Sequence, residues 1–159
     1  MSDPNDYVIG IFVLPEQAYA ELHPAFLKAY EALEGPEESW IEPGNATYAH
    51  AAEKAIELVE LGDPKTVSCL ETFADYLDDH LPEGFPDVGI YTPKEAATYL
   101  KTLERLEAEH GGATGLGEQI WQLDRDLDRE GVQNLYDEIR RVLTRAVEMK
   151  AAFAVDVLI

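Results

Sequence analysis

Two short apolar runs at opposite ends of the chain constrain its fold more than any other feature. Residues 7–14 read YVIGIFVL and stop at Pro15, and residues 152–159 read AFAVDVLI. Runs of this length, rich in β-branched and aromatic residues, are typical of buried strands. In the second run the odd-numbered residues from Phe153 to Ile159 share one face, and Ala154 and Asp156 share the other. We expect the two strands to meet in one sheet, which would make truncation at either end destabilising.

The first half of the sequence between these runs has mostly helical periodicity. In residues 16–34 the apolar side chains recur at three- and four-residue steps, and Pro24 predicts a kink or a division into two short helices. Residues 36–45 are predicted to form an acidic loop, followed by a helix over 47–61. Asp63-Pro64 is then typical of a new helix start. The expected buried side chains of the first segment are Tyr19, Leu22, Phe26, Tyr30 and Leu33.

The second half is predicted to continue in the same way. Residues 88–91 could form a short strand, and Thr92-Pro-Lys-Glu95 is a capping box that starts a helix ending by Gly111-Gly112. A flexible loop is expected over 111–117, and helices over 118–130 and 132–150. The sequence therefore predicts an α+β fold: a mostly helical single domain over 1–159, with the N- and C-terminal strands pairing in a small sheet.

The closing stretch carries a resemblance to a known family. Residues 135–158, LYDEIRRVLTRAVEMKAAFAVDVL, form a predicted helix that runs directly into a strand. Together with the opening strand and an acidic helical middle, this stretch resembles the C-terminus of the YfbM-like family of small bacterial proteins. The family's usual Gly- and Ser-containing stretch before a helix is absent from the middle of this chain. The resemblance implies an α+β fold, and it implies no activity because the family is uncharacterised.

Negative charge is concentrated in the middle of the chain. The formal net charge is −20, and residues 31–87 hold fifteen acidic side chains against two bases, Lys54 and Lys65. So few bases argue against a phosphate backbone or an anionic membrane surface as partner. No apolar run approaches the ~20 residues of a membrane span, and the first residues lack the pattern of a signal peptide. We therefore expect a cytoplasmic protein that binds neither nucleic acid nor membrane.

A basic protein is the partner that this charge favours. We expect an acidic binding module, such as a bacterial immunity or inhibitor protein that neutralises a basic partner. Trp40 would be an anchor in its acidic loop, unless it packs beneath that loop. A salt-adapted surface on a housekeeping protein is an alternative explanation of the acidity. The candidate partner-binding residues are Glu37, Glu38, Trp40, Glu42, Asp75, Asp78, Asp79 and Glu83.

Catalytic chemistry has weaker support. Asp78-Asp79-His80 has the residue types of a metal site, which leaves a small metal-dependent hydrolase as a further alternative, but its spacing matches no two-histidine signature. Residues 124–128, DRDLD, lack the glycine and glutamate of a calcium loop and predict an exposed charged helix face. Cys69, the single cysteine, is expected to be a buried structural thiol. We therefore expect no catalytic residue, no metal and no cofactor, and leave the oligomeric state open.

Overall fold

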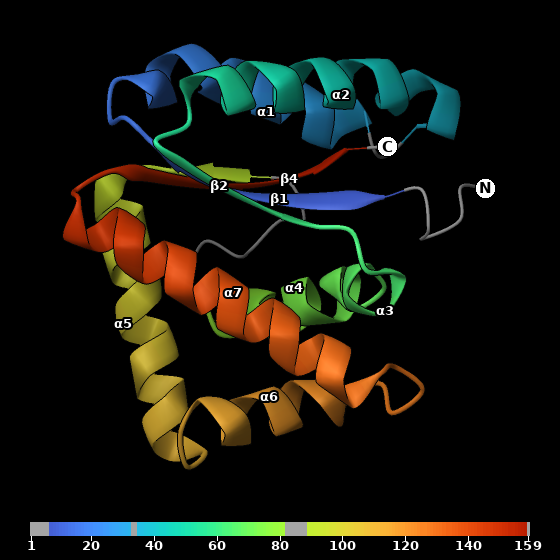
Figure 1. The fold of residues 1–159 in the computed structure, drawn as a ribbon, viewed down its shortest axis with the longest axis vertical. Coiled ribbons are helices and arrows are strands. Elements are labelled where there is room, and N and C mark those ends of the chain that lie inside the picture. The colour runs from blue at the N-terminus through green and yellow to red at the C-terminus, as the bar shows by residue number, and fades with distance from the viewer. Residues whose placement is uncertain (1–6, 33–34, 82–88, 159) are drawn as a thin grey trace.

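A sheet between two layers of helices makes up the fold (Figure 1). The computed structural model describes residues 7–32, 35–81 and 89–158. The upper face of the sheet, as drawn in Figure 1, is covered by α1 (Ala18–Ala32) and α2 (Glu37–Lys54). Below the sheet lie α3 (Pro64–Val67), α4 (Leu70–Asp78), α5 (Pro93–Glu109) and α7 (Arg129–Glu148), with α6 (Ala113–Trp121) beneath α7 and farther from the sheet. The predicted class, a mostly helical α+β fold, is confirmed.

The terminal strands form the centre of the sheet. The strands are β1 (Val8–Leu14), β2 (Glu57–Leu61), β3 (Gly89–Tyr91) and β4 (Ala152–Leu158). They pair antiparallel in the order β2-β1-β4-β3. The β1–β4 register runs without interruption from Val8 opposite Leu158 to Leu14 opposite Ala152. The predicted meeting of the two terminal strands is therefore confirmed, and so is the short strand near residue 90, although Val88 lies outside the described residues.

Side-chain alternation along the central strands creates two cores. In β1, Ile9, Ile11 and Val13 point to the lower core, whereas Phe12 and Leu14 point to the upper one. In β4, Phe153 and Val155 face down and Ala152 and Ala154 face up, as the sequence pattern predicts. The lower core is the larger because α4, α5, α6 and α7 all contribute buried side chains to it.

The first helical segment differs from its prediction in two ways. It forms one helix, α1, with Pro24 inside it. Both Pro24 and Ala20, whose carbonyl loses its usual N–H donor, are exposed, so that water can replace the missing hydrogen bond. Tyr30, predicted to be buried, is 43% exposed. The face turned toward the sheet instead comprises Ala18, Leu22, Phe26 and Ala29.

The region after α1 is the largest error of the sequence prediction. The predicted acidic loop over 36–45 belongs to the long helix α2, which packs against α1 and β4. The predicted helix over 47–61 ends at Lys54, and Glu57–Leu61 form β2. Pairing of β2 with β1, from Ile9 opposite Leu61 to Val13 opposite Glu57, outweighs the helical periodicity of this stretch.

The remaining helix boundaries follow from their caps. Asp63 caps α3 through the Lys65 N–H, and Thr92 and Glu95 form the predicted capping box. The helix expected after Asp63 is divided into α3 and α4. Gly111 and Gly112 adopt positive φ angles of 81° and 106°, and α6 begins directly after them, so the flexible loop predicted over 111–117 is wrong.

Residues 122–128 connect α6 to α7 instead of extending a helix. Asp128 caps α7 by accepting a 2.8 Å hydrogen bond from the Gly131 N–H. The charged helix face predicted over 124–128 is therefore wrong. In the described parts of the chain, none of the helices has both the length and the apolar character that a membrane crossing requires.

The upper layer approaches the sheet closely at Gly10. A Cβ atom at Gly10 would lie 2.5 Å from Cε2 and 2.6 Å from the hydroxyl oxygen of Tyr48. We therefore expect Gly10→Ala to displace Tyr48 and to lower the free energy of unfolding by about 1–3 kcal/mol, measured by urea denaturation. Gly62→Ala is the matched control, because its Cβ would have only Val8 Cγ2 nearby, at 3.8 Å. Equal stability of the two variants would contradict this account.

Candidate functional site

The structure separates the predicted partner-binding residues into two groups. Glu42 is exposed on α2, whereas Asp75, Asp78 and Asp79 are exposed on or directly after α4. Because α2 and α4 cover opposite faces of the sheet, the two groups do not form one surface (Figure 1). The backbone of residues 37–40 belongs to α2, but the side chains of Glu37, Glu38 and Trp40 lie outside the described part of the structure, as does all of Glu83.

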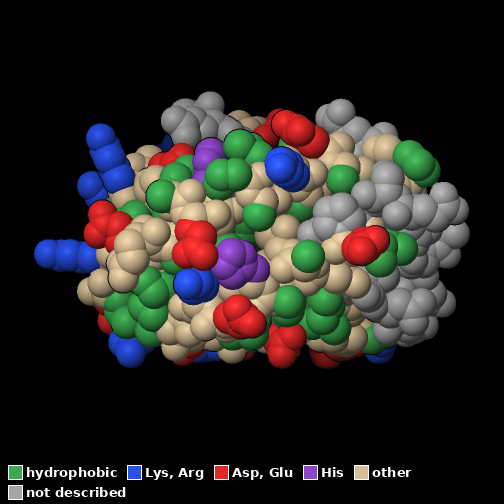
Figure 2. Space-filling view, turned by 90° about the horizontal axis from the view of Figure 1, so that it is seen from above, with side chains coloured by type: hydrophobic (Ala, Val, Ile, Leu, Met, Phe, Trp, Pro, Cys, Tyr) green, Lys and Arg blue, Asp and Glu red, His purple; other side chains and the backbone are tan. Residues whose placement is uncertain are grey.

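The view onto the upper layer does not show a uniformly acidic face. Among the described side chains in Figure 2, acidic, basic, histidine and hydrophobic groups are interspersed. In this layer Glu21 on α1 lies 3.0 Å from His50 Nε2 and 3.4 Å from Lys54 Nζ on α2. The carboxylate of Glu21 thus has nearby partners and joins the two helices. The described part of the upper layer therefore offers less unpaired negative charge than the sequence suggests.

The outer side of α4 carries a row of carboxylates. Glu71, Asp75, Asp78 and Asp79 are all exposed, and their spacing of four, three and one residues places them along one side of the helix. We call these four residues the α4 stripe. The other side of the helix is buried in the lower core by Leu70, Phe73, Ala74 and Leu77. No lysine or arginine occurs between Lys65 and Lys94, so this segment brings no cation of its own to the stripe.

The stability of the helix does not explain the α4 stripe. Asp78 is the last residue of α4 and Asp79 is its C-cap, where a negative charge opposes the helix dipole by typically 0.3–1 kcal/mol. Carboxylates four residues apart, such as Glu71 and Asp75, also repel each other. Glu71 lies in the first turn, where an acid suits the helix dipole, so it is the acids toward the C-terminal end that helix stability does not explain.

More acidic side chains lie where α3 meets α4. Burial, together with the charges of Asp128, Asp124 and Asp63, raises the pKa of the Cys69 thiol to about 11. Cys69 is buried and its thiol donates to the Lys65 carbonyl at 3.1 Å, which confirms the expected structural thiol. Asp63 and Asp128 serve as helix caps, so these two carboxylates have a structural function.

The described residues do not support the alternative prediction of a metal site at Asp78-Asp79-His80. His80 Nδ1 lies 2.7 Å from the Tyr76 carbonyl, and the His80 ring stacks on the Tyr76 ring at 4.4 Å. Asp78 and Asp79 are exposed beside it. Within residues 7–32, 35–81 and 89–158 there is no group of three or more His, Cys, Asp or Glu side chains placed to hold a metal ion.

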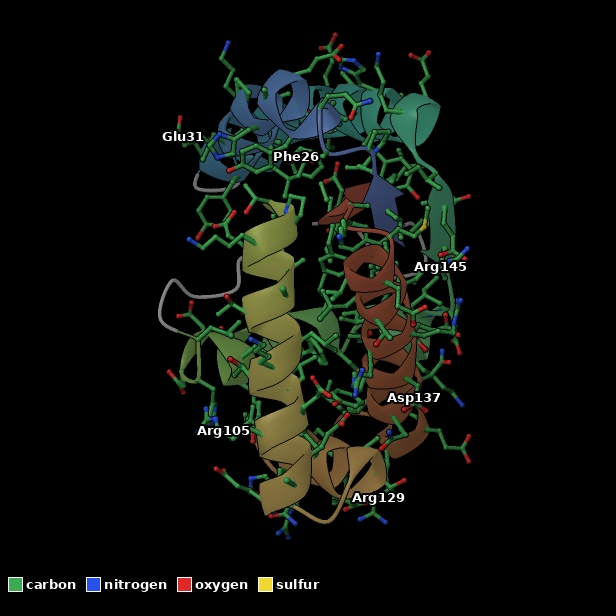
Figure 3. All side chains as sticks on the ribbon, turned by 90° about the vertical axis from the view of Figure 1, so that its left-hand side faces the viewer. Phe26, Glu31, Arg105, Arg129, Asp137 and Arg145 are labelled. Carbon is green, nitrogen blue, oxygen red and sulfur yellow. The ribbon has the colours of Figure 1, made fainter. Side chains whose placement is uncertain are left out.

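Sequence reasoning missed a shallow hollow on α7. Its volume is about 340 Å³, and α7 alone supplies the residues that line it; Asp137 and Arg145 lie along this helix in Figure 3. Its arginines stand out in so acidic a chain, but Arg140 pairs with Glu107 at 3.0 Å and Arg141 with Glu138 at 2.7 Å. The hollow is therefore close to neutral. The lining residues are Asp137, Arg140, Arg141, Thr144, Arg145 and Glu148.

A polar network beside this hollow joins α5 to α7. Arg140 donates to both carboxylate oxygens of Glu107, at 3.0 and 3.2 Å, and the Tyr136 hydroxyl donates to the same carboxylate. Burial raises the pKa of Glu107, but the hydrogen bonds from Arg140 and Tyr136 and the charge of Arg140 outweigh it, so that the pKa lies below its usual value. Burial of the Tyr136 hydroxyl and its interaction with the Glu107 carboxylate raise the pKa of Tyr136. The hydroxyl therefore stays protonated and donates its hydrogen bond to Glu107. This network stabilises the packing of the lower layer.

Comparison with known proteins adds no relative: no family model, curated protein or solved structure matches the chain. The resemblance to the YfbM-like family stays a prediction.

Removal of Glu107 should destabilise the protein measurably. Glu107→Ala leaves the largely buried Arg140 guanidinium and the Tyr136 hydroxyl without their acceptor, and we expect it to lower the free energy of unfolding by about 2 kcal/mol. Glu109→Ala is the control, because Glu109 pairs with Arg105 where the two side chains are 53% and 59% exposed. Such a pair contributes about 0–1 kcal/mol. A loss for Glu107→Ala no larger than that for Glu109→Ala in chemical denaturation would contradict the assigned role.

Proposed function

We propose that this chain is a cytoplasmic binding module that holds a basic protein partner on the α4 stripe, as an immunity or inhibitor protein would. The observation that carries the proposal is the exposed row of Glu71, Asp75, Asp78 and Asp79 along one side of α4, which extends to the C-terminal end where the helix dipole disfavours acids. The described part of the upper layer supports this role less, since the Glu21 carboxylate of α1 lies beside His50 and Lys54 of α2. The proposal therefore keeps Asp75, Asp78 and Asp79 of the sequence prediction and adds Glu71.

Electrostatics determine what kind of partner fits. A row of like charges attracts a surface of opposite charge and raises the rate of association by a factor of about 10 to 1,000, less so as salt screens it. The rest of the chain is also acidic, with a net charge of −20, so it repels phosphate backbones and anionic lipid surfaces. A protein surface rich in lysine and arginine remains the best match.

The test compares two variants of equal net charge. The stripe variant is Asp75→Asn/Asp78→Asn/Asp79→Asn. The control variant is Glu16→Gln/Glu53→Gln/Glu104→Gln, which neutralises three exposed carboxylates elsewhere. A basic protein captured by the wild type from a lysate of the source organism is purified, and its association with all three proteins is measured by stopped flow at several salt concentrations.

We expect the stripe variant to associate at least about tenfold more slowly, with a flatter salt dependence, while the control variant stays near the wild type. Equal rates for the two variants would show that only the overall charge of the chain matters. That result would contradict the α4 stripe as the binding surface and would favour a salt-adapted acidic surface.

A further inference from the structure

A buried aspartate lies between the upper helical layer and the sheet. Asp156 on β4 is 1% exposed, and its side chain faces the upper layer. Its Oδ1 accepts a 2.8 Å hydrogen bond from the Val157 N–H, whereas its Oδ2 has no hydrogen-bond partner among the described residues. Asp156 lies opposite Gly10 on β1, and Gly10 in turn lies opposite Glu60 on β2. The two carboxyl groups therefore occupy one row across the sheet, with the glycine between them.

Tyr48 covers this row from α2. Its ring lies against Gly10, and its hydroxyl donates to Glu60 Oε2 at 2.6 Å. Burial raises the pKa of Tyr48, and the charges of Glu60 and Asp156 raise it further, so the phenol stays protonated. A phenol has a single proton to donate. Because Glu60 receives it, the Tyr48 hydroxyl has no proton left to donate to Asp156.

No described cation compensates a charge on Asp156. On its β1 side no residue of Val8–Leu14 is titratable, and in β3 Gly89 and Ile90 are not, while Tyr91 belongs to the lower core. The face that α1 turns to the sheet is Ala18, Leu22, Phe26 and Ala29. Among the described titratable groups, Tyr48 on α2 feels the charge of Asp156, together with that of Glu60 on β2. An ionised carboxylate in such a place costs far more than a neutral one.

We propose that Asp156 is a pH-sensitive latch: its neutral carboxyl lets α1 and α2 close on the sheet, and its ionisation favours opening of this layer. Opening admits water to the carboxylate and exposes the apolar residues of the upper core, among them Phe12, Leu14 and Ile90. The inference does not depend on the α4 stripe, which lies on the other side of the sheet.

The direction of the pH effect follows from proton linkage. Burial raises the pKa of Asp156 in the closed state to about 7, and the Val157 N–H lowers it only partly. In the open, hydrated state the pKa returns toward 3.8. Between these two values opening releases a proton, so the opening equilibrium rises about tenfold per pH unit. Above about pH 7 the carboxyl is ionised in both states and the dependence levels off.

Hydrogen exchange of backbone amides across pH 5 to 8.5 tests this latch. After correction for intrinsic exchange rates, the opening equilibrium constant measured at amides of α1 and α2 should rise about tenfold per pH unit up to about pH 7. Above that pH it should stay constant. They should also exchange faster than amides of α7. In Asp156→Asn, which keeps the shape and removes the charge, the opening of α1 and α2 should not vary with pH. Glu60→Gln is the matched control and should keep the wild-type dependence.

Three results would overturn the proposal. One is a pH dependence that persists in Asp156→Asn or disappears in Glu60→Gln. Another is exchange of α1, α2 and α7 at one common rate, because the whole molecule would then unfold together. The third applies even when Asp156→Asn does not fold: the side-chain carboxyl carbon of Asp156 in the wild type is followed by NMR, and a titration midpoint near 4 in place of 7 would refute the latch.

Discussion

The pairing of the two chain ends is the constraint on which the rest of this structure depends. β1 and β4 form seven consecutive pairs at the centre of the sheet, and β2 and β3 add to their outer edges. Each helical layer then covers a face that exists only once both ends are in place. Contacts between residues so far apart in sequence carry a large loop-closure cost, so we expect folding to be slow for a mostly helical protein.

Alternation along these central strands gives the two faces different physical characters. The lower core is large, and Glu107, Tyr136 and Arg140 connect two of its helices, so the outer surface of α4 is presented on a well-packed support. The upper core is smaller, depends on the absence of a side chain at Gly10, and contains the uncompensated carboxyl of Asp156. The proposed binding surface and the proposed latch therefore belong to opposite sides of one sheet, and each can be altered without the other.

Local patterns predicted those parts of the fold whose cause is local. The terminal strands were recognisable from β-branched runs, and the Asp63 and Thr92 caps from residues three or fewer positions apart. The stretch over 57–61 was read as helix because its strand state depends on pairing with β1, some 50 residues earlier. The candidate site, like the fold, is predictable from the sequence only in part. Asp75, Asp78 and Asp79 are predicted from the concentration of negative charge in the middle of the sequence, but their separation from Glu42 follows from the layer to which each helix belongs.

The sequence by itself determined the class of the fold, the central strands, most helices and the surplus of negative charge, because each depends on neighbouring residues or on composition. Only the tertiary structure decided where in the molecule that charge lies. It paired Glu21 with residues of α2, used Asp63 and Asp128 as caps, and left the α4 stripe on the surface. It also buried Asp156 opposite Gly10 beneath Tyr48, which no local pattern indicates, since the burial of a carboxyl depends on elements that meet only in the folded chain.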